Sequence, residues 1–440
     1  MKKYIFSFFI ILMLTSCNLL SYFSSEEKET SEPEYKSQIA WTVDTNTYGL
    51  SDCRDMVRYG QYLYVIDGKQ FSGNYYFNLI KIEIETGEII WKTETIYTIV
   101  TCNVVKCGTK LYLAGEYDHY LYSFDDETGK LLATVTFSDD ENINEIISPD
   151  GLRNIVAYKD RYLFWSNYRN EDAKIIKFDT EKIDFSIEAE SLQIINAEAF
   201  GNTGNEEDFI YSCILLENGM IYYITSTAPR DNTFVKVGAV DCETGELKWS
   251  YVIQGCYATG GGYTMYYLDG KLYAFIGASV CFEAKTGIII YEFVQNFDNG
   301  RDDVSISKLQ YSSGVSYSNG RFYCTNTSSS GAPAMLGIDE KYIKNIQCID
   351  ARNGKLIWGD LPKDSSSLSG RPIVLKGKVF VPMYLQGLRV YDEKTGKFIG
   401  IDKNIKTTGA GRNESYKDLL IVMQWDTKKN TGLLTAIRVE

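Results

Sequence analysis

Histidine is almost absent from this chain: His119 is the only one in 440 residues, and no two of the ten cysteines are adjacent in sequence. A single histidine has no partner of its own kind for a metal-ligand set, so we expect His119 to be a surface or rim residue. Beyond the N-terminus, no apolar run is long enough to cross a bilayer. These absences argue against histidine-based metal chemistry and against further membrane spans.

Acidic residues outnumber basic ones, 58 to 45, which gives a formal net charge of −13. Such a field repels nucleic acid and anionic lipid head groups, so we expect protein partners and no nucleic acid. The chain is 44% hydrophobic and has 34 tyrosines, which supply enough apolar surface for one large all-β domain. No linker rich in proline, glycine or serine divides it.

The N-terminus has the pattern of an export signal. Lys2 and Lys3 precede an apolar stretch, residues 4–14, that is too short to span a bilayer. The sequence Leu14-Thr15-Ser16-Cys17 then resembles a bacterial lipobox, which implies lipidation of Cys17. The alternative is an ordinary signal peptide cleaved nearby. We expect export and a lipid anchor in the cell envelope, in the outer membrane, on its periplasmic side or at the surface.

Three segments follow from this pattern. Residues 1–17 form the lipoprotein signal peptide, and residues 18–38 are polar and contain proline, as expected for a flexible tether. Residues 39–440 form the folded domain.

A pair of hairpins recurs along the domain at a spacing of roughly fifty residues, which is typical of a propeller or solenoid. The second hairpin of most repeats closes on a glycine after a polar run, because a tight turn requires positive φ. These glycines are Gly87, Gly129, Gly245, Gly287, Gly354 and Gly396. The third repeat has Asp179-Thr180-Glu181-Lys182 instead, without a glycine.

The two ends of the domain each lack a strand partner. Residues 433–439 have no strand after them, and residues 39–43 have none before them. Pairing these ends would remove two open sheet edges. The sequence therefore predicts an eight-bladed β-propeller of four-stranded antiparallel blades, closed by its N- and C-terminal strands, and monomeric.

Aromatic residues follow the turn glycines at a fixed distance. Trp91, Trp249 and Trp358 each lie four residues after the glycine, and Tyr291 takes that place in the fifth repeat. We expect them to pack between neighbouring blades. The runs at residues 240–249 and 349–358 resemble the repeat of the pyrroloquinoline-quinone-type propellers.

This resemblance implies a fold more than a function. The family includes quinoprotein dehydrogenases and also non-catalytic lipoproteins of outer-membrane protein assembly. The dehydrogenases hold their cofactor with two adjacent cysteines, a Ca²⁺ ion and a catalytic aspartate, and this chain has no adjacent cysteines. We therefore expect a non-catalytic binding scaffold without a cofactor. The alternatives are a surface-exposed ligand-binding lipoprotein, a quinoprotein-type enzyme, and a hydrolase or lyase propeller.

The cysteines other than Cys17 are odd in number, so at least one is unpaired within the chain. Cys102 and Cys107 are too far apart, across extended residues, to form a disulfide. Four cysteines within strand patterns are expected to be buried free thiols: Cys242, Cys281, Cys324 and Cys348.

Loop lengths predict which face of the propeller is functional. The hairpin turns are short, whereas the connections on the opposite face are long, and long loops on a rigid scaffold usually carry recognition. Arg371 and Arg412 should point toward the axis on this long-loop face, and Tyr75, Tyr76 and Tyr168 should lie in its outer loops. These five are the candidate partner-binding residues. In the alternative interpretation, the arginines pair with acidic residues of adjacent blades.

An acidic run at residues 298–303 contains carboxylates and an amide, which are ligands that Ca²⁺ accepts. Its spacing does not match the known calcium-loop pattern, so we expect solvated loop charge and no metal site.

Overall fold

The computed structural model describes residues 32–44, 51–71, 74–96, 104–114, 120–137, 152–167, 175–182, 186–187, 192–195, 208–227, 234–254, 264–276, 278–292, 314–325, 345–360, 362, 370–407, 413–426, 428 and 431–440. The chain divides into two units, Met1–Glu34 and Tyr35–Glu440, and the second contains the described strands.

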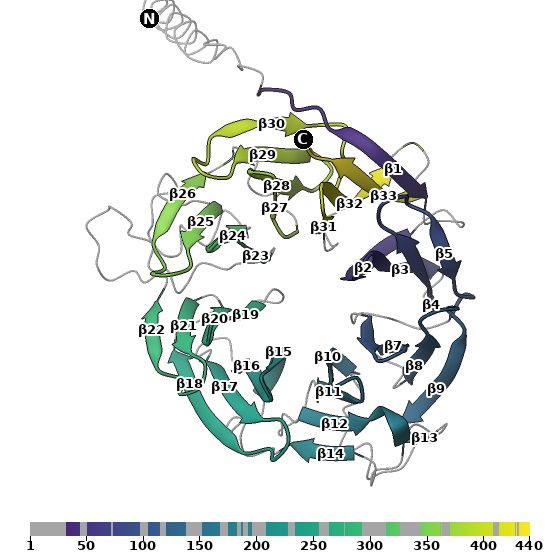
Figure 1. Ribbon diagram of the computed structural model, residues 1–440, viewed down its shortest axis with the longest axis vertical. Helices are drawn as coiled ribbons and strands as arrows, with labels where there is room; N and C mark the ends of the chain where they lie inside the picture. Colours follow the sequence, from purple (N-terminus) through teal and green to yellow (C-terminus); the bar gives the residue numbers. More distant parts are fainter. Residues whose placement is uncertain are drawn as a thin grey trace, which may run out of the picture. The chain divides into compact units, whose positions relative to one another are not determined.

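Eight antiparallel sheets, the blades, are arranged in a ring in the second unit (Figure 1). In blades 1 to 7 the strands pair in chain order, from the innermost to the outermost, and in blade 8 the N-terminal strand β1 pairs outside β33. The first four blades consist of β2 (Ser51–Tyr59), β3 (Tyr62–Phe71), β4 (Asn74–Glu83) and β5 (Ile89–Lys92); β6 (Val105–Cys107), β7 (Lys110–Ala114), β8 (Tyr120–Asp125) and β9 (Leu131–Phe137); β10 (Leu152–Tyr158), β11 (Tyr162–Asn167), β12 (Ile175–Asp179) and β14 (Leu192–Ile195); and β15 (Asp208–Glu217), β16 (Met220–Thr227), β17 (Phe234–Asp241) and β18 (Leu247–Gln254).

The remaining four blades repeat this order and bring the two ends of the unit together. They consist of β19 (Thr264–Leu268), β20 (Lys271–Ile276), β21 (Ala278–Glu283) and β22 (Ile289–Glu292); β23 (Val315–Ser318), β24 (Arg321–Thr325), β25 (Ile346–Asp350) and β26 (Leu356–Asp360); β27 (Ile373–Leu375), β28 (Lys378–Met383), β29 (Gly387–Asp392) and β30 (Phe398–Asp402); and β31 (Glu414–Tyr416), β32 (Leu419–Asp426), β33 (Thr431–Arg438) and β1 (Gln38–Asp44).

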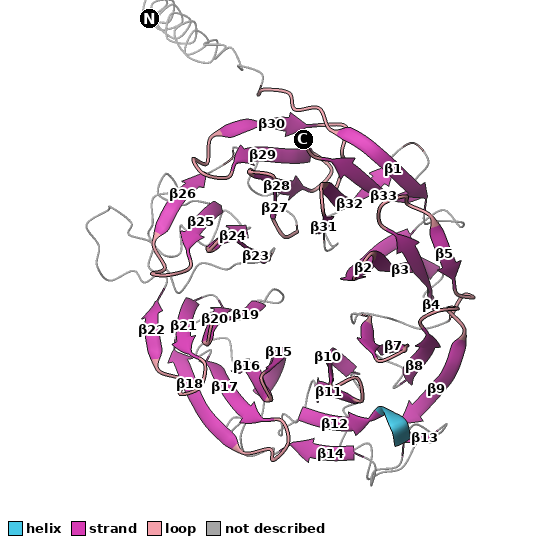
Figure 2. Cartoon of the chain, in the orientation of Figure 1, coloured by secondary structure: helices cyan, strands magenta, loops and turns pink. Residues whose placement is uncertain are grey.

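Closure of the ring occurs in blade 8, as predicted. The N-terminal strand β1 pairs antiparallel with β33, in a register that runs from Gln38 opposite Arg438 to Asp44 opposite Leu433. The eight-bladed, all-β fold is therefore confirmed, and the described residues contain almost no helix (Figure 2).

The turns confirm the predicted positions of the glycines. Gly87 and Gly129 have φ of 76° and 72°, in the left-handed region that other residues rarely adopt. In blade 3, where the glycine is missing, a short 3₁₀ helix, η1 (Thr180–Lys182), makes the turn.

Blade 2 has a fifth strand that the sequence did not predict. Strand β13 (Ser186–Ile187) pairs in parallel with the outer strand β9, opposite Thr136 and Phe137. One expectation was wrong. The β3–β4 hairpin extends through Phe71 and Asn74, so Tyr75 and Tyr76 lie on a strand rather than in a loop.

The core lies between neighbouring blades. Because side chains alternate across a strand, each blade presents an apolar face to both neighbours. The third residue of the second strand is buried in every blade, and it is aromatic in all except blade 8. These residues are Tyr64, Tyr112, Phe164, Tyr222, Tyr273, Tyr323, Phe380 and, in blade 8, Ile421.

The buried thiols are part of this core. Cys242, Cys281, Cys324 and Cys348 are buried and unpaired, as expected, and Cys107 is too. Burial raises the pKa of the Cys348 thiol to about 11. These thiols are therefore protonated packing groups at neutral pH.

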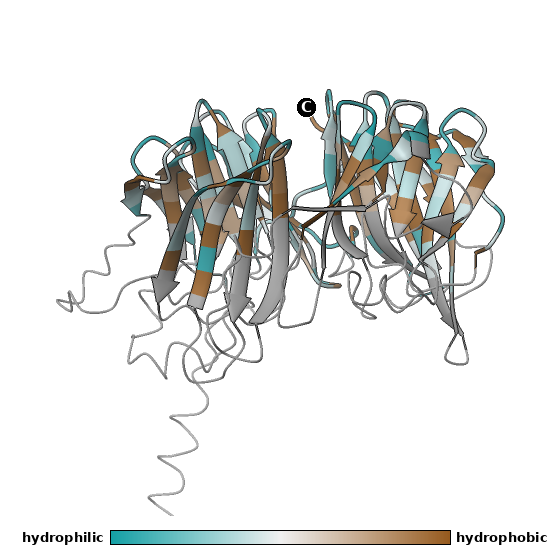
Figure 3. Ribbon diagram, turned by 90° about the horizontal axis from the view of Figure 1, so that it is seen from below, coloured by the Kyte–Doolittle hydropathy of each residue, from teal (hydrophilic) through white to brown (hydrophobic). Residues whose placement is uncertain are grey.

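Figure 3 shows the polar hairpin turns gathered along one face of the ring, with apolar strand residues between the two faces. We call this the tight-turn face. Within the described part of the chain, no helix has the length and apolar character needed to cross a membrane.

Candidate functional site

One contact recurs between the blades on the tight-turn face: an indole covers the turn glycine of the next blade. A Cβ atom on Gly287 would lie 2.4 Å from the ring of Trp249, so only glycine permits this approach. The indole Nε1 of Trp249 donates to the carbonyl oxygen of Ala284 at 2.8 Å. Tyr291 donates its hydroxyl to the equivalent carbonyl oxygen, that of Ala351. The predicted role of these aromatic residues, packing between blades, is thus confirmed.

The N-terminal strand supplies a further member of this set that the sequence reasoning missed. Trp41 on β1 donates to the carbonyl oxygen of Ile84 at 2.8 Å and covers Gly87. The sequence did offer a signal for Trp41. The residue lies in the strand predicted to form the outer edge of blade 8, and the outer strand is where other blades carry this aromatic residue.

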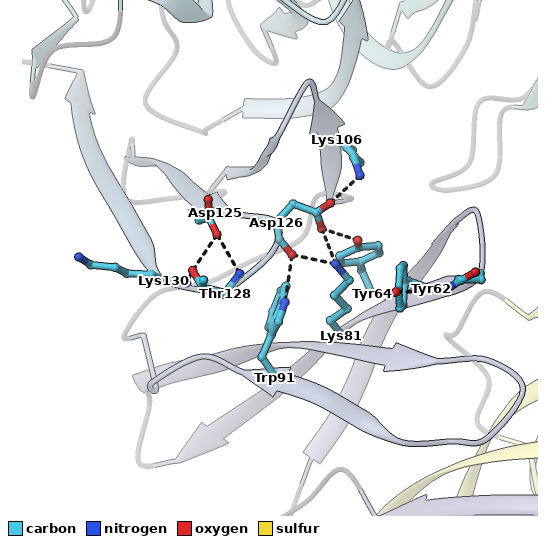
Figure 4. Close-up of polar contacts among 10 residues, drawn as sticks. Tyr62, Tyr64, Lys81, Trp91, Lys106, Asp125, Asp126, Thr128 and Lys130 are labelled. Atoms are coloured by element: carbon cyan, nitrogen blue, oxygen red, sulfur yellow. Dashed lines mark hydrogen bonds and ion pairs between the residues drawn. The ribbon is translucent and has the colours of Figure 1, made fainter.

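An acidic residue joins this contact between blades 1 and 2. Asp126 lies three positions before its turn glycine, where blades 1, 4, 5 and 6 have a small or apolar residue (Ile84, Cys242, Ala284 and Ala351) and blade 7 has Glu393. The carbonyl oxygen of Asp126 accepts from Trp91 Nε1 at 3.0 Å. Its carboxylate accepts from Lys106 at 2.5 Å, from Lys81 at 3.1 Å and from the hydroxyl of Tyr64 (Figure 4). Four side chains from two blades therefore meet at one residue.

Lys81 is the least exposed cation of this group. Its side chain is 7% exposed, and its Nζ lies 4.4 Å from the ring centroid of Tyr62 and 5.4 Å from that of Tyr64. The ammonium also donates to the carbonyl oxygen of Asp126 at 2.8 Å. Aromatic faces and oxygen acceptors together compensate for the desolvation of this charge.

The network fixes the ionisation of its members. Burial acts to raise the pKa of Asp126, but hydrogen bonds from Lys106, Tyr64 and Lys81 outweigh it and hold that pKa below its ordinary value. Burial, followed by the hydrogen bond to Asp126, raises the pKa of Tyr64 above its ordinary value. At neutral pH the group therefore holds a carboxylate and a neutral phenol.

Two other blade junctions use an acid in a similar position. Glu243 in blade 4 accepts from Lys177 at 3.0 Å and from Lys159 at 2.9 Å, both in blade 3. Glu393 in blade 7 accepts from Tyr323 at 3.2 Å. Sequence reasoning missed these groups, and the available signal was the departure of Asp126 and Glu393 from the small or apolar residue of the other repeats. Their contacts link neighbouring blades.

Arg371, predicted at the rim of the long-loop face, lies just before β27, the innermost strand of blade 7. Its Nη2 donates to the carbonyl oxygen of Asn413 at 3.1 Å and lies 3.6 Å from a carboxylate oxygen of Glu414, both in blade 8. The backbone of Gly314 in blade 6 packs against it, since a Cβ there would lie 3.2 Å from the Arg371 Cβ. Arg371 therefore contacts an acid of the neighbouring blade while 35% of its side chain stays exposed.

Of the other candidate partner-binding residues, the structure describes Tyr76 and the backbone of Tyr75. Tyr76 is half-buried on β4, opposite Lys69. Arg412, Tyr168, His119 and Cys17, and the side chain of Tyr75, lie outside the described residues.

The acidic run at residues 298–303 also lies outside the described residues. In the part that is described, no three histidine, cysteine, aspartate or glutamate side chains are grouped as metal ligands.

Comparison with known proteins identifies the N-terminal segment. Residues 1–18 match the model for the prokaryotic membrane lipoprotein lipid attachment site, which agrees with the predicted lipobox at Cys17. The chain is therefore that of a lipid-anchored envelope protein. No curated protein sequence matches it.

Several solved structures have the same fold. BamB from Moraxella catarrhalis is 12% identical, with a TM-score of 0.56 over 92% of this chain and 100% of that one. A europium-containing methanol dehydrogenase is 14% identical, with a TM-score of 0.62 over 93% and 96%. The quinohemoprotein alcohol dehydrogenase from Comamonas testosteroni is 13% identical, with a TM-score of 0.59 over 91% and 76%. The fold of the quinoprotein-type propellers is thus confirmed, and at these identities the likeness concerns the fold alone.

Proposed function

We propose that this protein is a non-catalytic scaffold that binds other proteins during assembly of the cell envelope or outer membrane. The observation that carries the proposal is the lipid attachment site at residues 1–18, in the same chain as a closed propeller. A lipid anchor holds the ring at a membrane surface, where it can meet partners without entering the bilayer. The fold likeness to BamB supports this reading.

The buried charges of the described residues fit a rigid scaffold. Asp126 and Glu393 each bind side chains of the preceding blade, and this stiffens the ring against relative movement of its blades. A rigid ring is a suitable support for recognition loops.

We propose the long-loop face as the partner-binding face, with Arg371 at its inner rim. The contacts to Asn413 and Glu414 hold the guanidinium in place and leave about a third of the side chain exposed, which reduces the entropy lost on binding. Arg412, Tyr75, Tyr76 and Tyr168 remain candidates for the same surface.

A quinoprotein-type enzyme is the second candidate, favoured by the fold likeness to the methanol dehydrogenase. The sequence lacks the adjacent cysteines that the quinoprotein resemblance implies for a cofactor site. Addition of pyrroloquinoline quinone, Ca²⁺ and a short alcohol to the purified protein tests this directly: turnover of an electron acceptor would replace the scaffold proposal with the enzyme.

The anchor is tested by Cys17→Ala in the full chain. We expect the variant to leave the membrane fraction while its thermal unfolding stays unchanged, because the lipid is attached outside the propeller. Retention of the variant in membranes after a high-salt wash would contradict the lipoprotein assignment. Protease treatment of intact cells then separates a periplasmic scaffold from a surface-exposed ligand-binding lipoprotein.

The partner face is tested by pull-down from solubilised envelope with an Arg371→Ala, Arg412→Ala double variant. Arg352→Ala is the matched control, since Arg352 is a tight-turn arginine whose side chain is 84% exposed and pairs with Asp350. We expect the double variant alone to lose a partner protein. The same partner set for the double variant and the wild type would remove both arginines from the site.

A further inference from the structure

Among the outer strands, β18 of blade 4 stands out by its length. It has 8 residues, whereas β5, β22 and β14 have 4 and β26 and β30 have 5. Strands β9 and β1, with 7 residues each, come next. In Figure 1, β18 lies at the rim of the ring, with its free edge directed outward. A long outer strand exposes a row of unpaired backbone donors and acceptors.

Apart from a bulge at Lys248, the residues of β18 do little to protect that edge. Leu247, Tyr251 and Val252 are 36%, 37% and 47% exposed. Its lysine, Lys248, is neutralised by Glu246 at 2.6 Å. Natural edge strands usually carry unpaired charge or proline to prevent pairing with another chain.

Two other outer edges are contacted by extended segments of the protein's own chain. Strand β13 pairs with β9 in blade 2. In blade 7, the backbone nitrogen of Tyr35 donates to the carbonyl oxygen of Ile401 on β30 at 3.0 Å. No such segment lies on β18 in the described part of the chain, although edge pairing is clearly compatible with this propeller.

We propose that β18 pairs antiparallel with β18 of a second copy, so that two propellers join edge to edge through blade 4. A two-fold axis perpendicular to the sheet brings the same edge of both strands together and keeps equivalent faces on the same side. Residues that lie opposite each other then have their side chains on the same face of the sheet, so one residue must lie opposite its own copy at the axis. Ser250 is the best residue for this position. It keeps nearly the whole strand paired and does not place a bulky side chain against itself. This arrangement replaces the monomer that the sequence led us to expect.

The sequence of β18 is complementary to itself in this register. Trp249 lies opposite Tyr251 of the second copy, on the face that also packs against blade 5, and aromatic cross-strand pairs are stabilising. Lys248 lies opposite Val252 of the second copy, and no two like charges face each other. This self-complementarity favours a second copy over an unrelated strand as the occupant.

Charge placed at Val252 tests both the pairing and its register. Val252→Lys sets a lysine opposite Lys248 of the second copy twice per dimer, and we expect the dimer dissociation constant to rise by about threefold to tenfold. Val252→Glu at the same position should lower it. The matched control is Ile290→Lys on the short strand β22, where the side chain is 44% exposed. The measurement is sedimentation equilibrium of the full-length protein in detergent, with thermal unfolding as a check of folding.

Ser250→Cys provides the second test, in membranes that contain the full-length protein. With the axis at Ser250, mild oxidation should give a cross-linked product of twice the chain mass, while Ile290→Cys and the wild type should not. A monomeric wild type at all concentrations, or equal responses to the lysine and glutamate at Val252, would overturn the proposal. A Ser250→Cys product of another mass would assign the edge to a different protein.

Discussion

The junction between blades 1 and 2 and the junction between blades 4 and 5 use the same aromatic contact with different chemistry beside it. Trp91 donates to the carbonyl oxygen of Asp126, and Trp249 donates to that of Ala284. Around Asp126 lie two lysines and a tyrosine, whereas Trp249 stacks on Phe282 with ring centroids 5.5 Å apart. One junction is charged and the other is apolar.

The difference shows which part of the repeat is constrained. The indole bonds a backbone carbonyl, so the side chain at that turn position is free to vary. The position of Lys81 in blade 1 is taken in blade 4 by Ala239, which is fully buried. A lysine and an acid are thus exchanged together for two alanines, as expected when either charge alone would be left without its partner.

Removal of the indole should have the largest effect on either junction. Trp249→Ala and Trp91→Ala should each lower the free energy of unfolding by about 3–5 kcal/mol, because a large buried side chain and its hydrogen bond are lost. Chemical denaturation of each variant measures this. A loss below about 1 kcal/mol in both would show that the indoles do not hold the blades together.

Removal of the acid alone should have the next largest effect. Asp126→Ala leaves Lys81 buried with one acceptor fewer and should lower the free energy of unfolding by about 3 kcal/mol. The double variant Lys81→Met, Asp126→Ala gives blade 1 the apolar character of blade 4. It should be more stable than the single variant by about 1–2 kcal/mol. A double variant less stable than the single one would show that the lysine does not depend on the acid.

The repeat and its closure could be read from the sequence because they rest on local patterns. Turn glycines such as Gly129 and aromatic residues such as Trp91 recur at fixed positions. The glycines indicate turns with positive φ, and the aromatic residues indicate packing between blades. The Asp126 network could not be read in the same way, since Lys106, Lys81 and Tyr64 come from separate strands and meet only after two blades pack. Strand β13 was missed for a related reason, because pairing two residues with a neighbouring blade leaves no periodic signal.

The candidate rim site stays a prediction. The structure places Arg371 just before the innermost strand β27. Its contacts with Asn413 and Glu414 depend on the angle between blades 7 and 8, which no local pattern encodes.

The charged junction should also respond to pH. The pKa of Asp126 is lowered in the folded protein, so its ionised form contributes stability above the unfolded-state value of about 4, and this contribution is lost as pH falls through the lower folded pKa. The difference in unfolding free energy between the wild type and Asp126→Asn should therefore be full at pH 7 and shrink below about pH 4. The measurement is denaturant unfolding of both proteins across this range. A difference that is the same at pH 7 and at pH 3 would exclude the ionised carboxylate as its source.

The smallest effect should come from the outermost partner of the same carboxylate. Lys106 bonds Asp126 at 2.5 Å, but its side chain is 35% exposed, whereas that of Lys81 is 7% exposed. Water therefore screens the outer pair, and Lys106→Met should lower the free energy of unfolding by no more than about 1 kcal/mol, less still at high salt. The loss of stability caused by Asp126→Ala should depend on salt much less, because the charge left without its carboxylate partner, that of Lys81, is buried. Unfolding of both variants at low and high salt separates the two cases. Equal losses for Lys106→Met and Asp126→Ala would mean that the carboxylate is held mainly from the solvent side, and that the contrast with the apolar junction lies at the surface rather than between the blades.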